Sequence, residues 1–209
     1  VPSDHLILQS DIYRETLKEG FDFISKNDSI LTLGITPTRP ETAYGYIQVN
    51  DSDTNPTKVK TFTEKPNFEM AKVFVESGEF YWNSGMFLFN INTITKSIET
   101  YLPEIATKFQ GKEHLLGTDK EQDFINDIYP TLPNISIDYG IMEKAQNVYM
   151  MISDFGWSDC GTWDSLYDFS PKDDNGNVAL NCTSQFYDSK NNIVALNNGK
   201  LAVIQGLEN

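Results

Sequence analysis

The chain has 209 residues, of which 39% are hydrophobic and 12% aromatic, a composition typical of a globular protein with a buried core. Its formal net charge of -14, with scattered Lys and Arg, argues against nucleic acid or an anionic membrane as a partner. Cys160 and Cys182 match neither a disulfide framework nor a zinc motif, so we expect free thiols in a reducing, cytoplasmic setting. No apolar run is long enough for a membrane span, and the first residues lack the pattern of a signal peptide.

Predicted helices and strands alternate along most of the chain. Helical spacing of apolar residues, short apolar runs and end signals such as Asn, Thr and Gly carry these predictions. In chain order they are helix 10–26, strands 30–35, 44–49 and 58–63, a helix between Asn67 and Gly78, strand 86–91, a mostly helical stretch over 93–129 broken at Pro103 and Gly117, helix 138–146, strand 148–152, and helix 162–169 capped by Thr162.

This alternation predicts an α/β layered domain over residues 1–170, followed by a turn-rich joint at 171–176. Two later apolar runs, 193–196 and 201–204, are separated by Asn and Gly, which indicates a hairpin or the corner of a solenoid. We therefore expect residues 171–209 to be a linker and the start of an all-β unit. Neither end of the chain resembles a natural terminus, and we expect both to be truncations of a longer protein.

Two acidic residues are candidates for a metal site. Asp4 lies in Pro-Ser-Asp-His, apparently just past the end of a strand, where open α/β sheets bind ligands and a carboxylate can hold Mg²⁺ against phosphate oxygens. Asp159 lies in a loop with close glycines and two tryptophans, which can present one carboxylate rigidly. The structural alternatives are a helix-capping or turn aspartate for Asp4, and an exposed residue at a Trp-rich core corner for Asp159.

A second group of candidates suits a sugar phosphate. Lys65 follows Glu64 where Pro66 ends a strand, so its ammonium could neutralise a phosphate, or it could form an ordinary strand-end ion pair. Glu41 and Gly45 share one segment, and Asn83 lies in another that also contains Gly. Glu and Asn side chains suit sugar hydroxyls, and a strand Gly allows close approach of a ligand, although both segments could be β-bulges.

Other candidates are weaker on the residues alone. Asp138 and Lys144 lie in a mixed polar and apolar segment and could simply be the cap and the end of a helix. The chain has two His, and no Ser-His-Asp or Cys-His set can be assembled around Cys160. A covalent mechanism is therefore disfavoured.

Taken together and in this order, six motifs resemble bacterial mannose-1-phosphate guanylyltransferase (GDP-mannose pyrophosphorylase). The resemblance covers residues 1 to about 169. The motifs are PSDH, TPTRPETAYGYIQ, FTEKP, YWNSGMFLF, SIDYGIMEK and FGWSDCGTW. The tail after residue 170 resembles the start of the C-terminal β-helix-like region of that family.

The resemblance implies an incomplete Rossmann-like nucleotidyltransferase domain, with Mg²⁺ as cofactor. It implies that mannose 1-phosphate and GTP are the substrates and that GDP-mannose and pyrophosphate are the products. Residue by residue, it assigns the metal to Asp4 and Asp159 and the sugar phosphate to Lys65, with Glu64 beside it. The family's sugar-pocket positions correspond to Glu41, Gly45 and Asn83. A further segment near the substrate corresponds to Asp138 and Lys144.

Some features depart from the family. The Gly-rich loop that grips the nucleotide triphosphate is expected before Asp4 and does not occur in this sequence, nor does a Walker or dinucleotide-binding pattern. We therefore expect the chain to be inactive alone and to self-associate through exposed sheet edges as a homo-oligomer or aggregate. Two smaller departures are Ala43, where Gly is usual, and Cys160, where Val is usual.

Three alternatives remain open at this point. The protein could act on another sugar 1-phosphate, which a substrate panel would reveal. It could be a non-catalytic sugar-phosphate-binding module, which would lack an upstream Gly-rich loop. It could also be an interaction domain whose motifs are coincidental.

Overall fold

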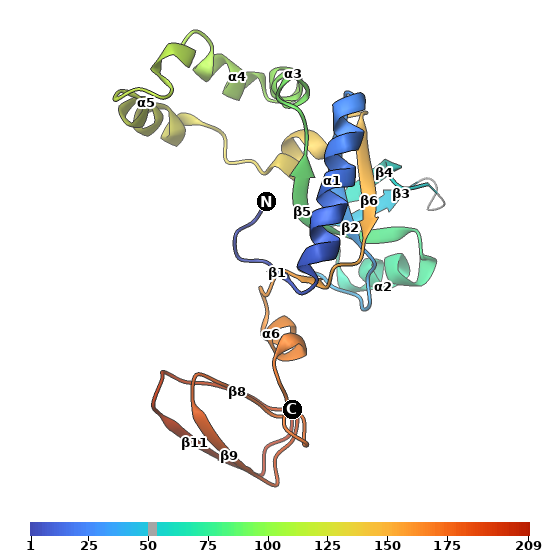
Figure 1. The fold of residues 1–209 in the computed structure, drawn as a ribbon, viewed down its shortest axis with the longest axis vertical. Helices are drawn as coiled ribbons and strands as arrows, with labels where there is room; N and C mark the ends of the chain where they lie inside the picture. The colour runs from blue at the N-terminus through green and yellow to red at the C-terminus, as the bar shows by residue number, and fades with distance from the viewer. Residues whose placement is uncertain (50–53) are drawn as a thin grey trace. The chain divides into compact units, whose positions relative to one another are not determined.

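The computed structural model describes residues 1–49 and 54–209, and the chain forms two compact units (Figure 1). The first unit comprises Val1–Ser3 and Ile7–Trp157, and the second comprises Asp4–Leu6 and Ser158–Asn209. Each unit has its own strands and its own buried residues. The domain boundary that we predicted at residue 170 stays a prediction.

Helices and strands alternate along the first unit, so the predicted mixed α/β content is confirmed. Two short strands, β1 (Leu6–Ile7) and β7 (Trp157–Ser158), form a small sheet of their own. The other elements are, in chain order, α1 (Ser10–Lys26), β2 (Ile30–Ile35), β3 (Tyr46–Val49), β4 (Thr57–Thr63), α2 (Phe68–Ser77), β5 (Phe80–Leu88), α3 (Ile91–Tyr101), α4 (Pro103–Phe109), α5 (Glu121–Ile128), the π-helix η3 (Asp138–Met142) and β6 (Val148–Ser153).

Five of these strands close into a barrel in the order β2-β5-β3-β4-β6. Within this barrel, as far as residues 1–49 and 54–209 describe it, β2 and β6 pair in parallel and the other neighbouring strands are antiparallel. The alternation of elements had predicted an α/β layered domain, but β3 and β4 follow each other directly, and short connections favour antiparallel pairing. The strands β2 and β6 are far apart in sequence, which leaves room for the long crossover that a parallel pair requires.

One core cluster of the first unit lies between the barrel and α1, which packs against β2 and β5 (Figure 1). A β-carbon on Gly20 of α1 would lie 2.9 Å from Leu88 Cδ2 and 3.1 Å from Leu31 Cδ2. Glycine at this position therefore lets the helix approach the strands closely. The side chains of Leu31, Leu33 and Phe155 are fully buried, and each contributes about 1.5–3 kcal/mol through removal of apolar surface from water.

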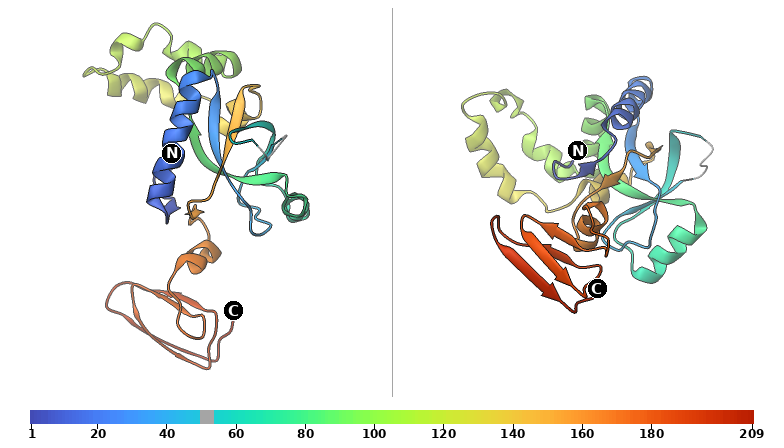
Figure 2. Two further views of the ribbon diagram at one scale, coloured as in Figure 1. Left: turned by 45° about the vertical axis from the view of Figure 1, so that its right-hand side comes forward. Right: turned by 60° about the horizontal axis from the view of Figure 1, so that its bottom comes forward.

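The helices α3, α4 and α5 extend from one end of the barrel as an arm (Figure 2). Pro103 occupies the first turn of α4, where its missing N–H costs nothing, as the predicted break requires. Phe109 of α4 packs edge-on against Phe124 of α5, with ring centroids 5.8 Å apart. Within residues 1–49 and 54–209, every helix is too short or too polar to traverse a lipid bilayer.

The second unit contains α6 (Trp163–Phe169) and four strands, β8 (Val178–Leu180), β9 (Thr183–Tyr187), β10 (Ile193–Ala195) and β11 (Leu201–Gln205). β10 pairs in parallel with β8, and β11 pairs in parallel with β9. Gly176, Asn191 and Gly206 occur at equal spacing along the chain, and all three have positive φ, at 77°, 56° and 67°. Successive turns of the chain therefore stack on each other with a repeated corner.

Three predicted elements need correction. The strand predicted at 86–91 starts six residues earlier, as β5, and Ile91 begins α3 instead, because Asn90 caps that helix by accepting from Thr93 N at 2.8 Å. The helix predicted at 138–146 is the shorter π-helix η3, in which Glu143 N donates to Asp138 O across five residues. The hairpin considered for the tail is wrong, because β10 and β11 each pair with an earlier strand.

Candidate functional site

Lys65 leaves the end of β4 in an unusual backbone conformation. Its φ is 45°, in the left-handed region that residues with a Cβ rarely adopt. Neighbouring residues of a regular strand point to opposite faces, but here Lys65 Nζ reaches Glu64 Oε1 at 3.1 Å. The Glu64 side chain is 17% exposed and that of Lys65 is 63% exposed. Backbone strain at a residue that presents a charge is typical of a functional site.

Gly45 keeps a small space open between Glu64 and Asn83. A β-carbon on Gly45 would lie 2.6 Å from Glu64 Oε2 and 3.7 Å from Asn83 Nδ2. The backbone of Gly45 also accepts a hydrogen bond from Asn83 N at 2.8 Å. The structure therefore brings a carboxylate oxygen and an amide nitrogen to the same point, where an alanine would displace the Glu64 side chain.

A β-bulge aims Asn83 toward this point. In β5, Ser84, Gly85 and Met86 stand opposite Leu33 alone, and Gly85 has φ of 70°. Ser84 Oγ donates to Leu33 O at 2.7 Å, which occupies the carbonyl that the bulge exposes. The bulge that we weighed as the structural alternative is therefore present at Asn83. Bulges often re-aim side chains beside active sites, and a ligand site at Asn83 stays a prediction.

Asp138 joins the same group from η3. Asn83 Nδ2 donates to Asp138 Oδ1 at 2.8 Å, which connects β5 to the first residue of the π-helix. Helical turns of this wide type are rare and are frequent at functional sites. These contacts bring together five of the predicted site residues, namely Gly45, Glu64, Lys65, Asn83 and Asp138, which we call the Lys65 cluster.

Charges in the Lys65 cluster shift the pKa of two groups. The hydrogen bond and the charge of Glu64 raise the pKa of Lys65 above its usual value, with smaller contributions from Tyr139 and Asp138. Burial raises the pKa of Glu143, and the charges of Glu64 and Asp138 raise it further. Glu143 therefore lies within the field of this acidic group, and it was not among the predicted site residues.

Glu41 and Lys144 have different surroundings. Glu41 Oε2 lies 3.4 Å from Arg39, its Oε1 accepts from Ala43 N at 3.0 Å, and its backbone N donates to Tyr46 OH at 2.9 Å. These contacts organise the loop before β3, in which Glu41 is 15% exposed. Lys144 is exposed after η3, and its charge acts on the neighbouring Glu143.

The second unit contains the two predicted metal ligands. Asp4 is exposed, and Asp159 is half-buried. Asp159 Oδ1 accepts from Gly161 N at 3.0 Å, and a β-carbon on Gly161 would lie 2.8 Å from Asp159 Oδ2. Between them, Cys160 has φ of 52°. A glycine and a residue of positive φ therefore fix this carboxylate in a tight turn.

The donor set fits Mg²⁺ more closely than a transition metal. Mg²⁺ is commonly bound by one or two protein carboxylates together with waters and substrate phosphates. Asp4 and Asp159 offer such oxygens in one unit, and the missing β-carbon of Gly161 leaves room beside Asp159 Oδ2. Across residues 1–49 and 54–209, no group of three or more His, Cys, Asp or Glu side chains could hold a metal ion by itself.

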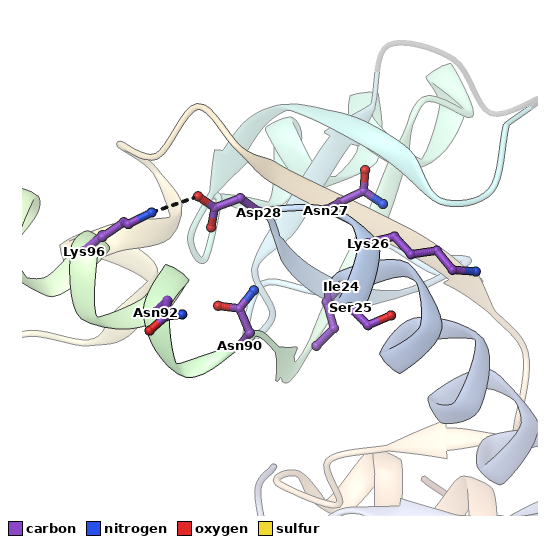
Figure 3. A pocket seen from close by; sticks show the side chains of 8 residues that line it. All are labelled: Ile24, Ser25, Lys26, Asn27, Asp28, Asn90, Asn92 and Lys96. Carbon is purple, nitrogen blue, oxygen red and sulfur yellow. Dashed lines mark hydrogen bonds and ion pairs between the residues drawn. The ribbon is translucent and has the colours of Figure 1, made fainter.

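A separate polar hollow of about 310 Å³ lies where α1 ends and α3 begins (Figure 3). Lys96 Nζ lies 3.2 Å from Asp28 Oδ2, and Asn90 is already engaged as the cap of α3. The hydrogen bonds from Thr93 and Lys96 lower the pKa of Asp28. These polar groups serve the helix end, and none of the predicted site residues lines the hollow.

Residues 1–176 match the family model described as nucleotidyl transferase. A mannose-1-phosphate guanylyltransferase of Escherichia coli is 35% identical over 98% of this chain and 45% of its own length. The xanthan biosynthesis protein XanB of Xanthomonas campestris is also 35% identical, over 100% of this chain and 44% of its own length. The chain thus spans less than half the length of these curated relatives.

A solved structure from Thermus thermophilus, titled a mannose-1-phosphate geranyltransferase, is similar over 100% of this chain and 59% of that chain, with a TM-score of 0.87 and 30% identity. A structure titled mannose-6-phosphate isomerase, from Helicobacter pylori, covers 76% of this chain and 62% of that chain, with a TM-score of 0.63 and 29% identity. The similarity in fold therefore extends over both units of the chain, each taken by itself.

Proposed function

Because this chain belongs to the nucleotidyl transferase family, we propose that it is part of a mannose-1-phosphate guanylyltransferase, which joins GTP and mannose 1-phosphate into GDP-mannose and pyrophosphate. The Lys65 cluster is the observation that carries this proposal. It places one cation, Lys65, beside hydrogen-bonding groups of both kinds at Gly45. A sugar phosphate needs such a combination, with a positive charge for the phosphate and mixed donors and acceptors for hydroxyls.

Lys65 would bind the phosphate of mannose 1-phosphate. In this reaction a phosphate oxygen of the sugar phosphate forms a bond to the α-phosphorus of GTP, and the bond from that phosphorus to the β-phosphate oxygen breaks. Both reactants are anionic, so positioning and charge neutralisation provide most of the catalysis. The hydrogen bond that Lys65 donates to Glu64 orients the ammonium until the phosphate binds. Glu64, Asn83 and Asp138 would bind or orient the sugar hydroxyls.

Asp4 and Asp159 would hold Mg²⁺. When bound, Mg²⁺ would neutralise phosphate charge during the transfer. The tight turn at Cys160 and Gly161 keeps the Asp159 carboxylate in one orientation, which limits the reorganisation that binding requires. Glu41 supports the loop before β3. We assign the exposed Lys144 to the rim of the sugar site, because its charge acts on Glu143 together with the charges of Glu64 and Asp138.

Two structural proposals accompany the function. The barrel of the first unit would form part of a Rossmann-like nucleotidyltransferase domain in the full-length protein, and the parallel ladders of the second unit support the start of a β-helix-like region. Contacts to the guanine base and the outer phosphates of GTP would lie outside this sequence. Catalysis is accordingly expected of the full-length protein, and self-association of the chain stays a prediction.

Turnover assays on the full-length protein test the function. GTP, Mg²⁺ and a panel of hexose 1-phosphates are supplied, and nucleotide sugar and pyrophosphate are measured. We expect GDP-mannose from mannose 1-phosphate, a loss of about 10- to 100-fold in kcat/KM for Lys65→Ala, and a loss of about a hundredfold or more for Asp159→Ala.

Exposed residues provide matched controls for these two variants. Lys72→Ala on α2 and Asp119→Ala in the arm remove the same charges elsewhere in the chain and should retain wild-type turnover. Normal activity of Asp159→Ala would refute the assigned role of that carboxylate. Faster turnover of another hexose 1-phosphate would refute the assignment to mannose.

A further inference from the structure

The side-chain oxygen of Asn83 has two donors within the fold. Thr32 Oγ1 on β2 lies 3.2 Å from Asn83 Oδ1, and the backbone N of Gly85 lies 3.1 Å from the same atom. An amide oxygen has two lone pairs, so both are occupied inside the protein. Asn83 therefore has no free acceptor for a ligand at this oxygen.

The side-chain nitrogen of Asn83 is only half used. One N–H donates to Asp138 Oδ1 at 2.8 Å, and an amide nitrogen carries two. The second N–H belongs to a nitrogen that lies 3.7 Å from the missing β-carbon of Gly45, next to Glu64 Oε2. Asn83 is thus arranged to act as a donor toward an oxygen of the ligand.

Thr32 is the least expected member of this arrangement. It is fully buried in the middle of β2, whose other residues are apolar or Gly. Valine has nearly the same shape and would suit such a strand without a hydroxyl to satisfy. Packing alone therefore does not require the hydroxyl. Its hydrogen bond to Asn83 Oδ1 connects the amide to the neighbouring strand β2.

The hydrogen bond from Gly85 alone does not fix the orientation of the Asn83 amide. The N–H of Gly85 belongs to the bulge that also carries Asn83, so both groups move together. The last torsion of an Asn side chain has a broad energy profile, and the amide can rotate unless partners on separate elements hold it. Thr32 on β2 and Asp138 on η3 are those partners.

We propose that Thr32 is a positioning residue for the sugar phosphate. Its hydroxyl keeps the Asn83 amide turned with its oxygen into the fold and one N–H available for an acceptor oxygen of the sugar. This inference rests on the proposed function, because it deepens the account of the same site. Thr32 itself does not touch the ligand.

The test compares two substitutions in the full-length protein. Thr32→Val keeps the shape and removes the hydroxyl, whereas Thr32→Ser keeps the hydroxyl and is the matched control. For Thr32→Val we expect KM for mannose 1-phosphate to rise about fivefold, as for loss of one hydrogen bond, with KM for GTP within about twofold of wild type. Thr32→Ser should stay close to wild type in both.

A double-mutant cycle separates positioning from a general structural effect. If Thr32 acts through Asn83, then Thr32→Val adds nothing to the KM of an Asn83→Ala protein. Full additivity of the two substitutions would overturn the inference. So would an unchanged KM in Thr32→Val.

A spectroscopic readout distinguishes failure of this inference from failure of the function. In protein labelled with ¹⁵N-asparagine, the side-chain NH₂ signals of Asn83 are identified by their loss in Asn83→Ala. We expect these signals to shift in Thr32→Val and to keep their positions in Thr32→Ser. If Thr32→Val shifts these signals but the wild-type protein forms no GDP-mannose, the function is refuted and the Thr32–Asn83 assignment is retained. Asn83 side-chain NH₂ signals that keep their positions in Thr32→Val would overturn the inference.

Discussion

The two units of this chain bury different kinds of side chain. In the first unit the fully buried large residues are almost all apolar, and they pack among the strands of the barrel and between the strands and the helices. They include Ile30, Leu31, Leu33, Met86, Met150 and Phe155. In the second unit polar residues are buried beside a few apolar ones, and they include Asn177, Ser189 and Asn192 next to Val178 and Ala202. The fold of the first unit therefore depends mainly on close packing of apolar side chains, and the fold of the second unit depends mainly on hydrogen bonds between buried polar groups.

The buried asparagines of the second unit form a ladder across its turns. Asn177 Nδ2 donates to Ser189 O at 2.9 Å, and Asn177 Oδ1 accepts from Asn192 Nδ2 at 2.9 Å. Asn192 Nδ2 then reaches Leu207 O, one turn further along the chain, at 3.0 Å. A buried polar group is costly unless it is paired, so each rung favours one register of stacking.

The largest expected effect comes from a cavity in the first unit. Leu33→Ala should reduce the free energy of unfolding by about 3 kcal/mol, because Leu33 is fully buried and the barrel cannot collapse around the missing atoms. Urea unfolding followed by tryptophan fluorescence reports this, since Trp82 and Trp157 are both buried in the first unit.

Val73→Ala is the control for the cavity variant, because Val73 is 61% exposed on α2. Removing its methyl groups should change the free energy of unfolding only slightly. An equal loss of unfolding free energy in both variants would contradict the view that close packing of buried side chains stabilises the first unit.

A smaller effect is expected when the ladder of the second unit is broken. Asn177→Ala leaves Ser189 O and the amide of Asn192 without their partner, which should cost about 2 kcal/mol. Hydrogen exchange read by mass spectrometry should become faster in β9 and β11 and stay unchanged in β2. Asn198→Ala, at an exposed corner, is the matched control. Faster exchange in β2 as well would show that the effect of these hydrogen bonds is not confined to the second unit.

Local signals in the sequence correctly predicted the elements whose end hydrogen bonds are made by residues nearby in the chain. The bounds of α1 and β2 agree with the prediction, and α2 begins after Asn67 and ends before Gly78 as expected. Asn67 accepts from Met70 N at 2.9 Å, and Gly78 has φ of 71°. Such caps depend on residues within one turn, so a pattern along the chain is enough to find them.

Elements that depend on distant partners were predicted poorly. The start of β5 contains Asn83 and Ser84, which interrupt the apolar pattern, and their hydrogen bonds go to β2 and η3. Those partners are far away in sequence, so periodicity gave no sign of them. The same holds for β10 and β11, whose partners are earlier strands and not each other.

The candidate site was predicted in part. Residues carried by motifs were named from the sequence, and the structure brings Gly45, Glu64, Lys65, Asn83 and Asp138 together, although their roles stay predictions. Thr32 could not be found, because a threonine within an apolar run is an ordinary strand residue. Its meaning depends on the amide of Asn83, which only the folded chain places beside it.

The smallest expected effect is a pH dependence confined to the second unit. The hydrogen bond from the backbone N–H of Asn177 lowers the pKa of Asp173 below its usual 3.8, with smaller contributions from the Asn177 side chain and the backbone of Asn175. A carboxyl whose pKa is lower in the folded state stabilises the fold above its unfolded pKa, and this stabilisation disappears as the pH falls through the folded pKa. Hydrogen exchange in β9 and β11 should therefore be slower in wild type than in Asp173→Asn near neutral pH, and the two should converge well below 3.8. Asp188→Asn, at another corner of the same unit, is the control. A difference between wild type and Asp173→Asn that persists in strong acid would mean that shape, and not the charge of this carboxylate, holds the first corner of the ladder.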